Sequence, residues 1–283
     1  MTLRQILVFT GTLILVTAAV ALWPGIVFGW GENADRLVVN NAVATLPQEM
    51  RPFFEANRRY LVQHVTDPTE AAAKNPAELH NEYIRLDHYG QYPFSTLPRV
   101  YKEAARKFSK RSLVANGLLP WEVGLYSAKL TDDFHSRNLA AAKLDAALLA
   151  HYVSMAHDPF NTTMNDDGHL SSQMGVNDRF GKKLVNRYAL FFYLHPNPAS
   201  FVTDPTDRAF ETCLTAHSLL ESVLLADRRS REGLQDYNDE YYDRFYSQAG
   251  ALLVRQISDA ATDVGSYWLT SWDNAGRPPL PAQ

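Results

Sequence analysis

A run of alanine and leucine residues in the middle of the chain most constrains its fold. This run, LAAAKLDAALLAHYVSMAH, covers residues 139–157. Leu144, Leu148, His151 and Met155 recur within it at helical spacing, so they share one face of a helix. Because the other faces are also largely apolar, we expect this helix to run through the centre of the protein.

Helical periodicity also dominates the rest of the chain, with no convincing run of alternating strands. Further helices are predicted in the segments 36–46, 97–110, 119–138, 179–194, 210–230 and 239–272. Three segments rich in Pro, Asn, Asp and Gly are predicted to be loops: 66–79, 157–175 and 195–207. None of these is long enough to separate two domains. The sequence therefore predicts an all-α protein with one compact multi-helix domain over residues 30–283, ending in a Pro-rich tail after about Ala275.

The N-terminal segment has the pattern of a secretory signal. Arg4 precedes a long apolar stretch, and Val27 and Gly29 suit the small-residue positions before a cleavage site. We expect residues 1–29 to be a signal peptide that is cleaved after Gly29, leaving Trp30 as the mature N-terminus. The alternative is an uncleaved anchor helix, in which residues 6–28 would span a membrane. Either way, the protein is expected in the periplasm or the cell envelope.

The composition of the chain limits the kinds of partner and the cellular compartment that fit this protein. The formal net charge is −4, and charged residues make up 20% of the chain. This balance does not match the basic surface of a nucleic-acid-binding protein, so a nucleic-acid partner is not expected. Cys213 is the only cysteine, which excludes an intramolecular disulfide and fits an exported bacterial protein better than a disulfide-stapled scaffold.

Several motifs occur together in a characteristic order. They are WGENADRLV (30–38), EYIRLDHYG followed by PFSTLPR (82–99), GLLPW (117–121), LAHYVSMAHDPFNTT (149–163), MGVNDRFGKKLV (174–185) and YWLTSWDNAGRPPLP (267–281). In this order and spacing, the chain resembles exported bacterial members of the zinc-dependent phospholipase C and single-strand-specific nuclease superfamily. The resemblance covers all of residues 30–283. It implies an all-helical domain that holds three zinc ions in a cleft, where zinc neutralises a phosphodiester and generates hydroxide.

Three of the family's ligand positions are retained. Trp30 matches the N-terminal Trp, whose amine and carbonyl bind zinc in the family. Asp67 matches an Asp that is a zinc ligand and a proposed general base. His151 matches the first His of the family's H-x3-D-x5-H helix motif.

The other six ligand positions are substituted. Asp35 and Glu82 stand where the family has His, Met155 replaces a bridging Asp, Asn161 and Asn177 replace His, and Gly181 replaces Glu. Neutral amides and a thioether are poor partners for a zinc cluster, and Gly has no side chain, so we expect the three-zinc cluster to be lost. His157 survives but occupies a position that is not a zinc ligand in the family.

Two interpretations of the remaining residues stay open. In the first, Trp30, Asp35, Asp67, Glu82 and His151 form a reduced site for one divalent metal, zinc or manganese. In the second, no cofactor binds, and Asp67, Glu82 and Arg85 form an ion-pair network. Arg85 stands where the family usually has Asp, and a cation there would substitute for lost metal charge.

Three functions follow from these interpretations. The first is a degenerate homologue that lacks the zinc cluster and acts as a pseudoenzyme or binding protein. Its ligand would be a small molecule or lipid that carries phosphate, held by Arg85 beside Trp30, Tyr83 and Tyr152. The alternative is a hydrolase that cleaves phosphate esters through the single-metal site, with Asp67 as base or ligand. The third is an interaction protein tethered to a membrane through residues 6–28.

Overall fold

The computed structural model of the protein describes residues 30–281. The signal or anchor segment expected over residues 1–29 lies outside the described residues. Within 30–281 the chain forms a compact multi-helix domain without any β-strand, which confirms the predicted all-helical class. No helix in this part of the chain combines the length and the apolar character needed to cross a membrane.

Eleven α-helices are joined by short helical turns over residues 30–281. The α-helices are α2 (Glu32–Thr45), α3 (Arg51–His64), α4 (Asp67–Lys74), α5 (Tyr101–Phe108), α6 (Lys110–Asn116), α7 (Leu119–Ser136), α8 (Leu139–Ala156), α9 (Leu184–Tyr188), α10 (Pro205–Ser218), α11 (Leu220–Arg231) and α12 (Asp239–Asn274). The turns are η1 (Pro76–Asn81), η2 (Leu86–Tyr89), η3 (Pro159–Thr162), η4 (His169–Ser171), the π-helical η5 (Asp178–Lys183) and η6 (Ala189–Phe191).

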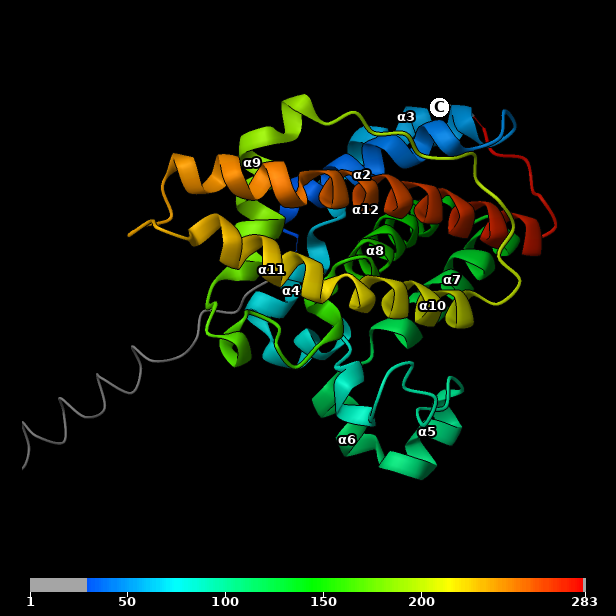
Figure 1. The fold of residues 1–283 in the computed structure, drawn as a ribbon. Helices are drawn as coiled ribbons and strands as arrows, with labels where there is room; N and C mark the ends of the chain where they lie inside the picture. Colours follow the sequence, from blue (N-terminus) through cyan, green and yellow to red (C-terminus); the bar gives the residue numbers. More distant parts are fainter. Residues whose placement is uncertain (1–29, 282–283) are drawn as a thin grey trace, which may run out of the picture.

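The Ala/Leu-rich helix α8 lies at the centre, as its composition predicts. Its residues from Ala146 to Ala156 are buried, apart from the partly buried Leu148. The helix begins at Leu139 because the Asn138 side chain accepts a hydrogen bond from the Ala141 amide, at 3.3 Å. Its small side chains let neighbouring helices approach closely. Long helix α12 runs across the molecule, with α2 and α3 on one side and α10 and α11 on the other, and α8 behind (Figure 1).

Two contacts fix α12 against these neighbours. The Trp268 ring stacks on Phe54 of α3, with 4.6 Å between the ring centroids, and its indole N–H donates to the Ala146 carbonyl of α8 at 2.9 Å. A side-chain carbon at Gly265 would lie 1.9 Å from the Thr45 hydroxyl, so α2 and α12 can meet here only at a glycine.

The loop predicted over residues 66–79 is partly wrong, because α4 occupies Asp67–Lys74. Pro68 lies in the first turn of this helix, where a missing amide hydrogen removes no helical bond. The helix predicted over residues 97–110 starts later and is interrupted at Ser109, whose φ of 69° separates α5 from α6. The segment 210–230 likewise divides, at Leu219, into α10 and α11.

The Pro-rich tail folds back onto the domain. The Trp272 indole donates to the Pro278 carbonyl at 2.8 Å, and Leu280 packs against the core. The tail is thus part of the packed structure as far as residue 281.

Candidate functional site

A buried histidine between two carboxylates forms the centre of the candidate site. His151 lies in the last turns of α8 and is fully buried. Its Nδ1 lies 3.2 Å from Asp35 Oδ2, and its Nε2 lies 2.6 Å from Glu82 Oε2. Asp35 comes from the first turns of α2, and Glu82 follows η1, so three separate elements meet at this ring.

The surroundings of His151 favour its charged form. Burial alone would lower the pKa of the imidazole, but the charges and hydrogen bonds of Glu82 and Asp35 outweigh it and raise the pKa to about 10. The ring is therefore an imidazolium near neutral pH, donating from both nitrogens. The Ser154 hydroxyl, one helical turn further along α8, donates to the other Asp35 oxygen at 2.6 Å.

A third buried acid, Asp158, lies next to this cluster. Asp158 is fully buried, and this burial raises its pKa to about 7. A hydrogen bond from the Phe160 amide to Oδ1, at 2.9 Å, acts in the opposite direction. The buried Trp30 indole also favours the charged form, and the nearby Asp35 disfavours it. Nevertheless, neither Trp30 Nε1 nor Asp158 Oδ2 has a hydrogen-bond partner among the described residues.

Sequence reasoning did not select Ser154 or Asp158. Ser154 follows His151 by three residues, which places the two side chains on the same face of α8. That periodicity could have identified Ser154 as part of the cluster, whereas Asp158 lies beyond the end of α8 and no helical periodicity points to it.

The substituted ligand positions that follow on the chain are also buried. The Asn161 amide donates to the Met155 carbonyl at 3.2 Å and lies 3.3 Å from the Met155 sulfur. Asn177 donates to the Asp166 carbonyl at 3.1 Å, and its own side-chain oxygen has no partner among the described residues. Gly181 lies within the π-helical turn η5. Met155 and Asn161 thus contact each other.

Asp67 and Arg85 are paired elsewhere. Asp67 Oδ2 lies 2.8 Å from His64 Nδ1, and Arg85 Nη2 lies 3.1 Å from Asp166 Oδ2. The Arg85 guanidinium also lies over the Tyr83 ring, 4.8 Å from its centroid. The prediction of an ion-pair network among Asp67, Glu82 and Arg85 is therefore wrong. None of the three pairs with another: their partners are His64, His151 and Asp166, respectively.

The geometry limits what this cluster can do with a metal ion. Both nitrogens of His151 point at carboxylates, so neither has a lone pair free for coordination, and the two carboxylates lie on different sides of the ring. Over residues 30–281, no group of three or more His, Cys, Asp or Glu side chains is arranged to hold a metal ion. The residues present do not fit the zinc cluster that the family resemblance implies.

Comparisons with known proteins leave the family unassigned. No family model matches the chain, and no curated protein matches it significantly.

Proposed function

We propose that this protein is an exported, degenerate relative of the zinc-dependent phospholipases C and nucleases that acts as a binding protein without the zinc cluster. The observation that carries the proposal is the contact of His151 with Asp35 and Glu82. These three residues occupy positions that the resemblance assigns to zinc ligands, and they come from distant parts of the chain. Their meeting at one buried point supports the alignment on which the resemblance depends.

Charge explains how such a core remains stable without a metal. Buried carboxylates without a counter-charge are strongly destabilising, and a divalent ion would normally supply that charge. Here the imidazolium of His151 supplies it, with the Ser154 hydroxyl as a further donor. Met155 and Asn161 fill neighbouring space with mutual contacts.

Arg85 is the group we assign to ligand binding. Its side chain is one-third exposed, lies over Tyr83 and is held by the partly exposed Asp166. A phosphate group can accept two parallel hydrogen bonds from a guanidinium, as a carboxylate does, and a phosphate monoester also carries more charge, so it can displace Asp166 from the guanidinium. The ligand class is therefore a small molecule or lipid that carries phosphate.

Metal content tests the proposal directly. Elemental mass spectrometry on protein exported by a bacterial host, and never exposed to chelator, should find well under one zinc or manganese per chain. One bound metal per chain that is lost in both His151→Ala and Asp67→Ala would overturn the proposal. That result would favour the hydrolase with a single-metal site, and phosphodiester assays would follow.

The alignment itself has a separate test. The triple variant Met155→Asp, Asn161→His and Asn177→His restores three family ligands, and we expect it to bind zinc more tightly than the wild-type protein. The matched control carries Asn57→His, Asn186→His and Met164→Asp, which make the same changes outside the cluster. Equal zinc affinity in the two variants would show that the cleft is misplaced.

A further inference from the structure

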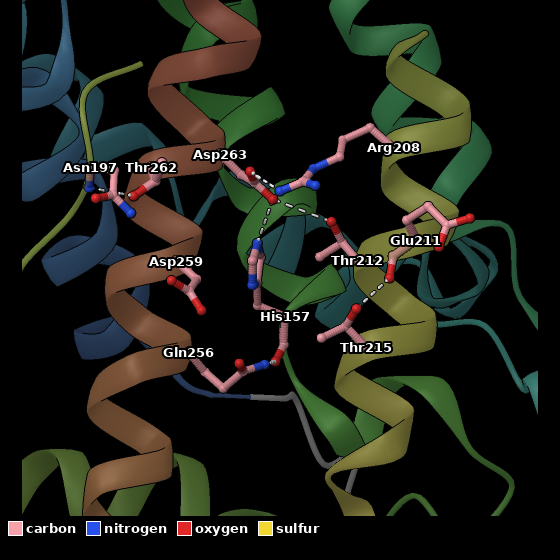
Figure 2. Close-up of a pocket in the computed structure, with 10 residues that line it drawn as sticks. All are labelled: His157, Asn197, Arg208, Glu211, Thr212, Thr215, Gln256, Asp259, Thr262 and Asp263. Atoms are coloured by element: carbon pink, nitrogen blue, oxygen red, sulfur yellow. Dashed lines mark hydrogen bonds and ion pairs between the residues drawn. The ribbon is translucent and has the colours of Figure 1, made fainter. Parts of the chain in front are cut away.

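A separate pocket opens between α10 and α12, with His157 at its floor (Figure 2). Its volume is about 250 Å³. Every residue that lines it is polar or charged: His157, Asn197, Arg208, Glu211, Thr212, Thr215, Gln256, Asp259, Thr262 and Asp263. A ligand that fits this pocket must therefore be small and carry a polar or charged group that matches these side chains.

His157 is held in one orientation by its neighbours. Its side chain is 7% exposed, and its Nε2 lies 3.0 Å from Asp263 Oδ2. The Gln256 side-chain amide donates to the His157 carbonyl at 2.8 Å and fixes the backbone at the end of α8.

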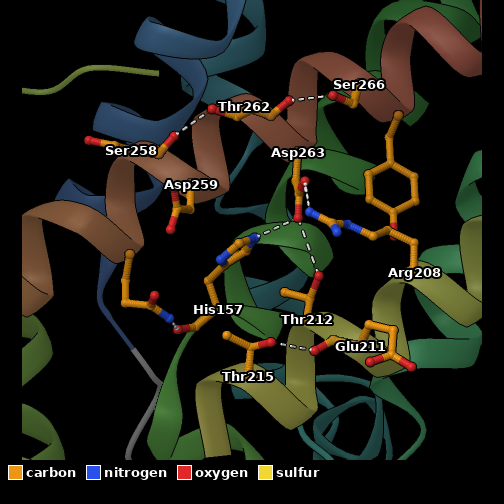
Figure 3. A network of polar contacts seen from close by, with 12 residues as sticks. His157, Arg208, Glu211, Thr212, Thr215, Ser258, Asp259, Thr262, Asp263 and Ser266 are labelled. Carbon is orange, nitrogen blue, oxygen red and sulfur yellow. Dashed lines mark hydrogen bonds and ion pairs between the residues drawn. The ribbon is translucent and has the colours of Figure 1, made fainter. Parts of the chain in front are cut away.

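Asp263 determines which nitrogen of this ring carries the proton. Arg208 Nη2 donates to its Oδ1 at 2.7 Å, and the Thr212 hydroxyl donates to its Oδ2 at 3.2 Å (Figure 3). Burial would raise the pKa of Asp263, but His157 and Arg208 outweigh it and lower that pKa. Ionised Asp263 can only accept hydrogen bonds, so His157 Nε2 carries a hydrogen and, in the neutral ring, Nδ1 is an acceptor.

Nδ1 has no hydrogen-bond partner among residues 30–281, and it faces the side of the pocket where Asp259 lies (Figure 2). Asp259 is the least compensated carboxylate of the lining. Glu211 is paired with Arg99, and Asp263 with Arg208. Within residues 30–281, the single ion pair of Asp259 is a longer contact with Arg255, at 3.5 Å. Arg255 is 81% exposed, so water screens its charge.

We propose that this pocket binds a small organic cation that carries a primary ammonium group. An ammonium has three donors and no acceptor, and the pocket offers it the Asp259 carboxylate and His157 Nδ1 as acceptors. The Thr215 hydroxyl, whose hydrogen goes to the Glu211 carbonyl at 2.9 Å, has further lone pairs to offer. Arg208 is neutralised by Asp263 and therefore repels such a ligand little. The proposal is independent of the function proposed for the His151 cluster.

The test uses three probes of equal length on the intact protein: propylammonium, 1-propanol and propionate. Binding is followed by calorimetry and by the NMR signals of the histidine rings. We expect saturable binding of propylammonium alone, with the His157 signals shifting and the His151 signals unchanged.

Two variants make the test specific. Asp259→Asn should weaken propylammonium binding at least tenfold, because it removes the charge that an ammonium recognises. Asp273→Asn is the matched control, since it removes another α12 carboxylate that has an arginine four residues away, and should leave binding unchanged. The proposal is overturned by absence of saturable binding, by equal binding of 1-propanol, or by equal loss in both variants.

Discussion

Two histidines near the end of α8 both contact carboxylates but differ in the number of ring nitrogens that have such a contact. His151 contacts a carboxylate at each ring nitrogen and is fully buried. His157 contacts one carboxylate, and its other nitrogen faces a polar pocket. Asp263, the partner of His157, has two further donors, whereas His151 is the only cation between Asp35 and Glu82 in the described part of the chain.

This difference separates a structural from a ligand-accessible histidine. Two carboxylates hold the His151 ring as an imidazolium, which has no lone pair to offer and balances buried negative charge. One carboxylate orients the His157 ring, and its other nitrogen has no partner among the described residues. Both rings are buried, so the number of carboxylate contacts, more than burial, distinguishes the two.

The largest effect we expect is that of removing the His151 ring. His151→Ala leaves Asp35 and Glu82 close together without their counter-charge, and loss of one partner of a buried ion pair typically costs about 3–5 kcal/mol. Urea denaturation of the variant and the wild-type protein measures this difference in free energy of unfolding. A loss below about 1 kcal/mol would show that the cluster is not charged as described.

Alkaline pH should weaken the same cluster without a mutation. The pKa of His151 is about 10 in the folded protein and about 6.5 in the unfolded chain, so its stabilising contribution is complete below about pH 6.5 and is lost as pH rises through 10. We expect the free energy of unfolding to fall by about 2–4 kcal/mol between pH 7 and pH 10. The buried Cys213 thiol, whose pKa is raised by burial, adds a smaller decline from about pH 8.5 upward, and tyrosines with raised pKa values add to it from about pH 10 upward.

The control for this pH dependence is His151→Gln, which cannot titrate. Its free energy of unfolding, measured by urea denaturation at the same pH values, should fall clearly less than that of the wild-type protein between pH 7 and pH 10. The decline that remains is expected above about pH 8.5, where the Cys213 thiol ionises only in the unfolded chain because burial raises its pKa in the folded protein. An equal slope in the variant and the wild-type protein would assign the pH dependence to other groups.

Local patterns in the sequence were sufficient for the main helices. The prediction over residues 139–157 differs from α8 by one residue, because apolar content and the Asn138 cap are both local signals. Helix α3 was missed, although Pro52 at its start and the buried Phe53, Phe54 and Leu61 are compatible with a helix. Helix α4 was taken for a loop because Asp-Pro also begins turns, and only packing decides between the two.

The candidate site was predictable only through the resemblance to a family. Asp35 and Glu82 lie 116 and 69 residues from His151 in sequence, and no periodicity connects them. The pairing of His157 with Asp263, 106 residues away, was not anticipated either. The family's ligand pattern gives His157 no role, and its contact with Asp263 depends on how α8 packs against α12.

The smallest effect we expect comes from the second histidine. In His157→Ala, Asp263 loses one hydrogen bond but keeps Arg208 and Thr212, so its charge stays compensated. Loss of a hydrogen bond to a charged group typically costs about 1.5–3 kcal/mol, and we expect the lower end of this range because Asp263 keeps its other partners. Urea denaturation of His157→Ala and His151→Ala compares the free energy of unfolding that each ring contributes. A loss in His157→Ala as large as that in His151→Ala would contradict the distinction drawn between the two rings.

The variant Arg208→Gln tells which of the two partners compensates the charge of Asp263. If Arg208 is the main counter-charge, this variant should lose more free energy of unfolding than His157→Ala.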